Sequence, residues 1–129
     1  MTAINTTFPW MSYYKNYNYF LNILRNHNKV SKIVELNKDK GYFKLYLKDS
    51  RELKLFICEC YCFSVAEYEE ALSNLKEIDA VVINSSWCGY TSDVKDYCKA
   101  QKVGIFKISE FLGAINLKNF WNYIPPDER

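Results

Sequence analysis

The sequence predicts an α/β fold with one mixed β-sheet: an antiparallel three-strand meander followed by βαβ crossovers, with helices on both faces. Two observations support this prediction. Three apolar runs between residues 30 and 63 are separated only by short turns, and strands joined in this way pair antiparallel. Two later apolar runs each follow a helical pattern, and such strands run parallel through right-handed crossovers. The expected order is α-β-β-β-α-β-α-β-α, in a single α/β domain over residues 1–129.

The composition is that of an ordinary globular protein. A chain of 129 residues with 49% hydrophobic and 25% charged residues can bury a core of its own. A net charge of +2 does not by itself indicate nucleic acid binding. No apolar run approaches the roughly 20 residues of a membrane span, and the N-terminus lacks the pattern of a signal peptide. We therefore expect a cytoplasmic protein with no membrane partner.

The pattern before residue 27 predicts a helix over about residues 10–26. Its apolar side chains recur at helical spacing: Tyr13, Tyr17, Phe20, Leu21 and Leu24. Strands follow at "VSKIVEL" and "GYFKLYL", separated by the turn-forming "NKDKG". The turn "KDS" then leads to "RELKLFICECYCF", residues 51–63, whose nearly continuous apolar run predicts a central strand buried on both faces.

The second half of the chain alternates helices and strands. Ser64 and Glu67 form the signature of a capping box, and Thr91 or Ser92 is placed to cap a later helix. The predicted elements are a helix over 64–78, a strand over 79–84, a helix over 91–102, a strand over 103–108 and a short helix over 109–115.

Five cysteines and one histidine bear on metal and redox chemistry. Cys58, Cys60 and Cys62 alternate, so one strand would point all three to the same face. A thiolate metal site is the functional interpretation, but the spacing favours three small buried side chains, expected as thiols in the cytosol. His27 is expected at the surface near a helix C-terminus rather than as a ligand.

The stretch "VVINSSWCGYTSDVKDYCK" resembles the strand–cysteine–helix layout of glutaredoxins and thioredoxins. This resemblance implies that Cys88 is a redox nucleophile whose pKa is lowered by a helix N-terminus. The chain after Cys88 is too short for the rest of that fold and has no proline before Pro125. The structural alternative is that Gly89 relieves a turn and Thr91 caps a helix. Reaction of Cys88 with iodoacetamide well below about pH 8.5 would support the redox alternative.

The chain from the first helix to "DAVVIN" resembles the α-β-β-β-α-β core of the PD-(D/E)XK nuclease superfamily, the restriction-endonuclease-like fold. In that family the second strand carries an aspartate and the third carries E-x-K. The two acidic groups hold a divalent cation, and the lysine stabilises developing charge or orients water. Residues i and i+2 of a strand share a face, so E-x-K brings both groups to one site.

The resemblance implies a site at Glu59, with Tyr61 where the family has lysine and Lys44 where it has aspartate. Asp49, in the turn, is a second carboxylate that would have to reach inwards to a metal. Glu59 lies in an apolar run, where an unpaired carboxylate is costly, so it either binds metal or pairs with a lysine such as Lys44. The degenerate motif leaves two hypotheses: a nuclease with a rearranged site using Mg²⁺ or Mn²⁺, and a non-catalytic binding domain. Whether the protein is an enzyme stays open.

Positive charge gathers on the predicted meander. The residues expected to face phosphate groups are Lys38, Lys40, Lys48, Arg51 and Lys54. Tyr42 and Tyr46 could stack on single-stranded bases, or they could serve as core or sheet-face residues. The structural alternative is a solvated strand edge that lysines protect from aggregation. The partners expected are therefore DNA or RNA, or else a protein partner or a second copy in a homodimer.

Overall fold

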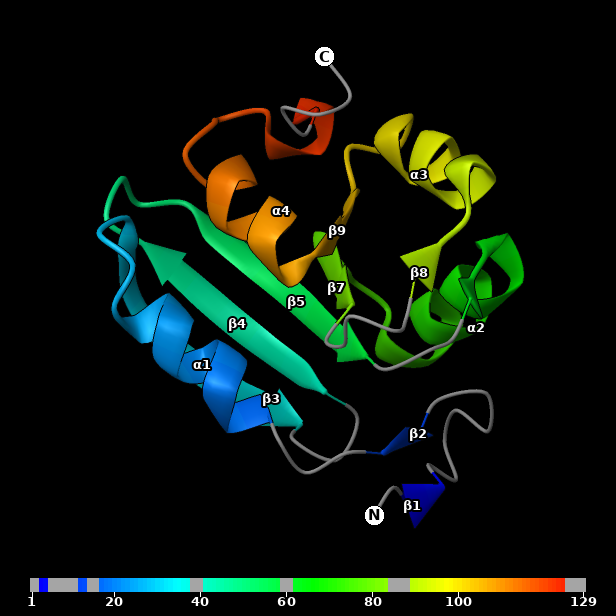
Figure 1. Cartoon of the computed structure of the whole chain (residues 1–129), viewed down its shortest axis with the longest axis horizontal. Helices are drawn as coiled ribbons and strands as arrows, with labels where there is room; N and C mark the ends of the chain where they lie inside the picture. The colour runs from blue at the N-terminus through cyan, green and yellow to red at the C-terminus, as the bar shows by residue number, and fades with distance from the viewer. Residues whose placement is uncertain are drawn as a thin grey trace.

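The central feature of the fold is a five-stranded mixed sheet with strand order β3-β4-β5-β7-β9 (Figure 1). A computed structural model describes residues 3–4, 12–13, 17–37, 41–58, 62–83 and 89–124. The strands of this sheet are β3 (Val30–Asn37), β4 (Tyr42–Leu47), β5 (Glu52–Cys58), β7 (Ala80–Ile83) and β9 (Gly104–Lys107).

The strand pairing has two parts. The strands β3, β4 and β5 are antiparallel, with Phe43 of β4 opposite Leu55 of β5. The strands β5, β7 and β9 are parallel, and Val82 lies between Ile57 and Phe106. The predicted meander followed by two βαβ crossovers is thus confirmed.

Helices cover the two faces of this sheet. They are α1 (Tyr17–Arg25), α2 (Val65–Leu75), α3 (Ser92–Lys99) and α4 (Ile108–Ala114), with a 3₁₀ turn η2 (Phe120–Asn122) near the C-terminus. In Figure 1, α1 and α4 lie in front of the sheet. The ring of Phe111 joins them to it, since its centroid lies 6.1 Å from that of Phe20 and 5.7 Å from that of Phe106.

The opposite face is covered over the parallel strands. Both crossovers advance across the sheet in the same direction, so right-handed connections place α2 and α3 on one face. Tyr68 of α2 packs edge-on against Tyr97 of α3 at 6.1 Å. Phe56, which faces away from α1, contacts Phe63 just before α2.

Burial along the strands follows from this arrangement. In β4 every second residue is buried, so that Phe43 and Leu45 face α1 while Tyr46 on the other side is half-buried. In β5 the run Leu55–Cys58 is buried throughout, as expected for a central strand covered on both faces. The buried side chains form one hydrophobic core from Phe20 to Phe120.

Two expected elements differ in extent. Residues 12 and 13 form strand β2 (Ser12–Tyr13), paired with β1 (Ala3–Ile4), so the helix expected over residues 10–26 does not include Tyr13. The strand expected over residues 51–63 is also wrong, because β5 ends at Cys58 and a separate strand β6 (Cys62–Phe63) pairs with β8 (Gly89–Tyr90).

The break after β5 corrects the expectation that its cysteines share one face. Cys58 is buried in the central sheet, whereas Cys62 is exposed in the small β6–β8 sheet. The thiols of these two residues therefore do not line a common face of one strand. An apolar run predicts that a segment is buried, but it does not specify which strands the segment pairs with.

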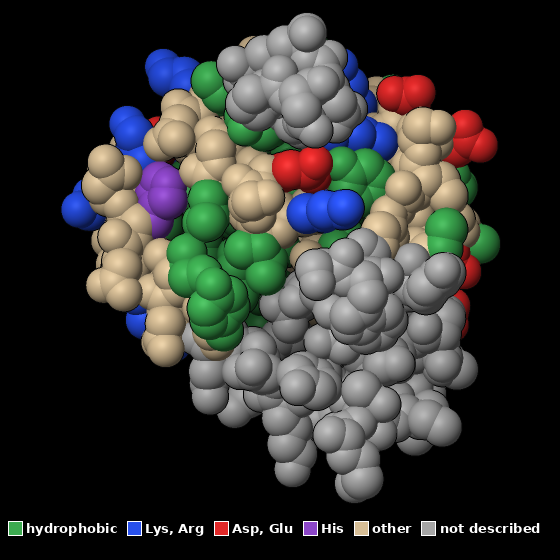
Figure 2. Space-filling view, in the orientation of Figure 1, with side chains coloured by type: hydrophobic (Ala, Val, Ile, Leu, Met, Phe, Trp, Pro, Cys, Tyr) green, Lys and Arg blue, Asp and Glu red, His purple; other side chains and the backbone are tan. Residues whose placement is uncertain are grey.

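The predicted helix caps are present. Ser64 and Glu67 form the capping box of α2, and the Thr91 hydroxyl accepts a hydrogen bond from the Val94 N–H at 3.2 Å. His27 lies two residues beyond the C-terminus of α1 and is partly exposed, as expected; in Figure 2 the one histidine of the sequence, coloured purple, is visible at the surface. Its Nδ1 accepts a hydrogen bond from the Lys29 N–H, which leaves Nε2 to donate to the Leu112 carbonyl at 3.0 Å. None of the helices in the described ranges is long and apolar enough to cross a membrane.

Candidate functional site

The candidate site lies on the side of the meander that faces away from α1. The alternation in β4 places Tyr42, Lys44 and Tyr46 on this side. The strand register adds Lys32 beside Tyr46 and Lys54 beside Lys44. We name this surface the open face and define it by these residues: Lys32, Val34, Tyr42, Lys44, Tyr46, Glu52 and Lys54. All of them are half-buried or exposed.

Tyr46 is the centre of the open face. The ammonium of Lys32 lies 4.7 Å from its ring centroid, and that of Lys44 lies 5.3 Å from it. Both distances are within the range of cation–π attraction. Lys44 also forms an ion pair with Glu52, with 2.8 Å between Nζ and Oε1. This hydrogen bond raises the pKa of Lys44 above its usual value, so the ammonium stays charged at neutral pH.

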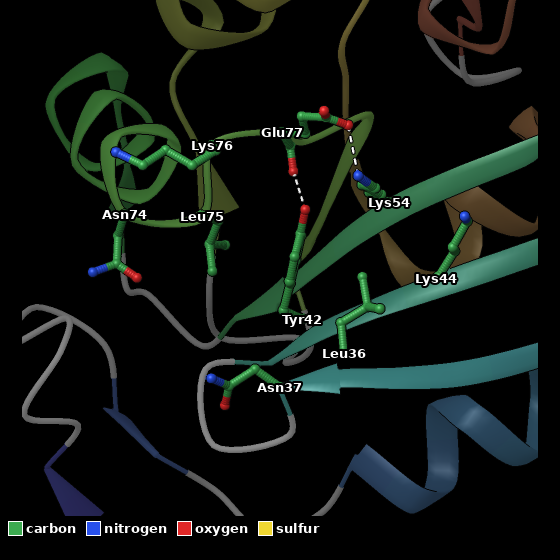
Figure 3. A pocket seen from close by; sticks show the side chains of 9 residues that line it. All are labelled: Leu36, Asn37, Tyr42, Lys44, Lys54, Asn74, Leu75, Lys76 and Glu77. Carbon is green, nitrogen blue, oxygen red and sulfur yellow. Dashed lines mark hydrogen bonds and ion pairs between the residues drawn. The ribbon is translucent and has the colours of Figure 1, made fainter.

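A hollow of about 520 Å³ adjoins the open face at the end nearer to α2 (Figure 3). Tyr42, Lys44 and Lys54 rise into it from the sheet, and Asn74 and Leu75 come from the last turn of α2. The end of β3 supplies the remaining side through Leu36 and Asn37. Lys76 and Glu77, in the loop after α2, complete the lining, so the hollow combines apolar, amide, cationic and acidic side chains.

Hydrogen bonds hold the end of α2 against the sheet. The hydroxyl of Tyr42 donates to the backbone carbonyl of Glu77, and Lys54 Nζ lies 2.6 Å from Glu77 Oε2. The bond between these two side chains raises the pKa of Lys54 and lowers that of Glu77. The backbone N–H of Lys54 also donates to Asp79 at 2.8 Å. Glu77 and Asp79 thus hold the loop after α2 beside the hollow.

The described residues among the expected phosphate contacts fall into two groups. Lys54 lies on the open face, and Lys48 is exposed in the turn after β4. Arg51 is half-buried, and its guanidinium donates to the carbonyl oxygens of Ile115 at 2.7 Å and Leu117 at 2.6 Å. Arg51 is thus a structural residue that binds the end of α4 to the β4–β5 hairpin.

Of the expected metal-site residues, Glu59 lies outside the described residues and Asp49 lies in the turn before β5. The Asp49 carboxylate accepts a hydrogen bond from Arg51 Nε at 2.8 Å. The seven residues of β5 separate this turn from Cys58, a length of roughly 20 Å at the usual rise per residue. Lys44 pairs with Glu52. In the part of the chain that the structure describes, no three His, Cys, Asp or Glu side chains are placed to hold a metal.

Several predicted site residues lie outside the described ranges: Glu59, Tyr61, Lys38, Lys40 and Cys88. Their proposed roles remain predictions. In the segment after Cys88, Thr91 has the capping role that the structural alternative expected. The neighbouring Tyr90 hydroxyl donates to Glu110 at 2.8 Å and accepts from Lys95 at 3.2 Å, which ties α3 to α4.

One part of the site was missed by sequence reasoning. Lys32 belongs to the run of positive charge on the predicted meander, but only the register between β3 and β4 places it beside Tyr46. Asn74 and Glu77 carry no motif and reach the hollow only because the end of α2 packs on the sheet. The period-two pattern of "YFKLYL" was the available signal, since it places both tyrosines of β4 on one side with Lys44.

No family model, curated protein or solved structure matches this chain significantly. The function is therefore inferred from its own residues and their arrangement.

Proposed function

We propose that this protein is a non-catalytic domain with a restriction-endonuclease-like arrangement, and that it binds single-stranded DNA or RNA through the open face. The observation that supports this proposal is the position of the Tyr46 ring beside the ammonium groups of Lys32 and Lys44, on the side of β4 that is half-buried. Proteins that bind single strands combine aromatic rings, on which bases stack, with cations that follow the phosphate backbone.

The charges of the open face suit a polyanion. Lys32, Lys44 and Lys54 contribute three cations, of which Lys44 is paired with Glu52 and Lys54 with the adjoining Glu77. Because Glu52 is half-exposed, with 51% of its side-chain surface accessible, water screens its pairing with Lys44. A phosphate group can therefore replace this carboxylate at Lys44 at little cost.

The surroundings of Lys44 favour binding over cleavage. The resemblance to the nuclease superfamily puts Lys44 where an aspartate would hold the metal. Here that position carries an ammonium paired with Glu52, and an ammonium has no lone pair to give to a metal ion. A site with this residue in place of a metal ligand is suited to hold phosphate rather than to activate water.

The proposal is tested by fluorescence anisotropy with labelled single- and double-stranded DNA and RNA. Stacking on an aromatic side chain contributes about 1–3 kcal/mol per base, so Tyr46→Ala should weaken single-strand binding roughly 5- to 150-fold. Tyr46→Ile, which keeps a strand-forming side chain, should weaken it similarly. Tyr19→Ala is the matched control, because Tyr19 is 64% exposed on α1, over the opposite face. Equal losses for Tyr46→Ala and Tyr19→Ala, or no binding by the wild type, would refute the proposal.

Salt dependence provides an independent measurement. If three lysines neutralise phosphates, the logarithm of the association constant should fall with the logarithm of salt concentration with a slope of about −2. Lys32→Ala should reduce this slope by about 0.7, whereas Lys99→Ala on α3 should leave it unchanged. A slope near zero would exclude phosphate contacts by the open face.

The alternatives give different results in the same preparation. An active nuclease would cleave the labelled strands with Mg²⁺ or Mn²⁺, and Glu59→Ala would abolish the cleavage. A protein partner or a homodimer would instead use β3, an edge strand of the sheet with Val34 and Leu36 exposed. Light scattering would then detect a dimer that Leu36→Lys dissociates, and the protein would not bind nucleic acid. This result would favour the homodimer.

A further inference from the structure

The hollow beside the open face has the chemistry of a nucleotide-binding pocket. Its volume of about 520 Å³ is within the usual range of about 300–1,000 Å³ for small-molecule sites. Leu36, Leu75 and the ring of Tyr42 offer apolar surface for a flat base. Lys44 offers an ammonium group for a phosphate, and the Lys54 ammonium lies in the same lining in an ion pair with Glu77.

Amide side chains lie on two sides of the hollow. Asn37 comes from the end of β3 and Asn74 from the last turn of α2, and Figure 3 shows them on different sides of the space. An asparagine amide combines donors with an acceptor and can form a pair of hydrogen bonds with a base edge. The hollow can therefore discriminate between bases, whereas stacking on Tyr46 accepts any base.

The position of the hollow connects it to the open face. Lys44 belongs to both, since its ammonium lies over the Tyr46 ring while its side chain lines the hollow. Tyr42 also lines the hollow and lies on the same side of β4 as Tyr46. A strand that stacks on Tyr46 therefore passes the opening of the hollow.

The frame of the hollow is fixed before a ligand binds. Tyr42 and Lys54 both bind Glu77, one through its carbonyl and the other through its carboxylate. Lys76 lies between α2 and Glu77 and has a positive φ of 76°. Residues other than glycine adopt this backbone conformation at some cost. Such preorganisation reduces the entropy lost on binding.

We propose that this hollow holds one nucleotide of the bound strand, with its base between Leu36 and Leu75 and its edge read by Asn37 and Asn74. The inference rests on the proposed function, because the open face delivers the strand to the hollow. It goes further by assigning base preference to a defined set of residues.

The test compares binding of the four homo-oligonucleotides of one length. The wild type should prefer one base by about 10-fold or more, equivalent to ~1.4 kcal/mol. Asn37→Ala/Asn74→Ala should reduce this preference to less than about 3-fold while retaining affinity for the weakest oligonucleotide. Leu36→Trp, which fills the hollow from an exposed position, should have the same effect. Tyr46→Ala should instead weaken all four equally.

The outcomes separate the two proposals. If all four oligonucleotides bind equally well, or if the preference survives in both hollow variants, the pocket is refuted while strand binding stands. Failure of every oligonucleotide to bind refutes both. Titration with the four nucleoside monophosphates distinguishes a strand from a free nucleotide as ligand. A monophosphate that binds as tightly as the oligonucleotide and displaces it would show that the hollow serves free nucleotides, and would overturn the assignment to a strand.

Discussion

The guanidinium of Arg51 donates from Nη2 to the backbone carbonyl of Ile115 at 2.7 Å, across 64 residues of sequence. Ile115 is the C-terminal cap of α4, where carbonyl groups lack partners within the helix. Nη1 reaches the Leu117 carbonyl at 2.6 Å, and Nε is paired with Asp49. One side chain thus holds the hairpin, the end of α4 and the following turn together.

Arg51→Ala should lower the free energy of unfolding by about 1.5–3 kcal/mol, because hydrogen bonds from a charged group to several carbonyls are lost. Arg51→Lys should recover only part of this, since an ammonium lacks the planar fork. Lys48→Ala, at the exposed turn, should change stability by less than about 0.5 kcal/mol. Urea denaturation followed by circular dichroism measures all three. Equal effects of Arg51→Ala and Lys48→Ala would contradict the structural role.

The turn between β4 and β5 offers a stabilising substitution. Ser50 has a φ of 77°, and its N–H donates to the Leu47 carbonyl at 3.1 Å. Glycine adopts this left-handed conformation without steric cost, but it also has the larger entropy in the unfolded chain. The first effect exceeds the second, so Ser50→Gly should raise the free energy of unfolding by about 0.5–1 kcal/mol. Ser50→Ala retains the Cβ atom and should give no gain. Thermal unfolding of both variants compares them, and stabilisation by alanine would disprove the explanation.

Gly104 is required by close packing in β9. A Cβ atom there would lie 2.3 Å from a ring carbon of Phe106, whose side chain is fully buried. Gly104→Ala should therefore destabilise the protein by about 1–3 kcal/mol, as overpacked core substitutions do. Gly89→Ala is the matched control, because among the described residues no atom lies within 4 Å of a Cβ added at Gly89. Chemical denaturation should separate the two variants, and comparable stability would show that the core around Phe106 adapts.

Cys98 gives the folded state a dependence on alkaline pH. Burial, with the nearby charge of Glu69 as a smaller cause, raises the pKa of its thiol from 9.0 to about 12. The thiol in the unfolded state loses its proton at lower pH than the thiol in the folded state. The contribution of Cys98 to the free energy of unfolding is therefore constant below about pH 9 and falls as the pH rises from there towards 12. Between pH 8 and 10 the expected loss is about 1 kcal/mol.

The measurement is urea denaturation of wild type and Cys98→Ala at pH 8 and 10. The variant should lose less stability over this interval, because alanine does not titrate. Burial also raises the pKa of Tyr68, so part of the pH dependence should remain in the variant. Identical pH dependence in the two proteins would show that Cys98 does not contribute.

The sequence by itself determined the features that depend on neighbouring residues. The capping box of Ser64 and Glu67 and the cap at Thr91 form within three residues, so their side chains select the helix starts locally. The period-two pattern of β4 and the short turns around it likewise predict the meander, because side-chain alternation and loop length are local properties.

Tertiary structure decided the features that depend on distant residues. Cys62 and Phe63 pair with β8 in a small sheet separate from β5, and an apolar run does not specify this pairing. Arg51 has the charge of a phosphate-binding residue, but the position of α4 makes it a structural one.

The candidate site shows the same division. The sequence placed Tyr42, Lys44 and Tyr46 on one side of a strand. Only the assembled sheet brought Lys32 to Tyr46 and the end of α2 to Lys54. Backbone geometry sets the alternation of side chains along one strand. Burial of the whole core sets which strand lies beside it and which face each helix packs on.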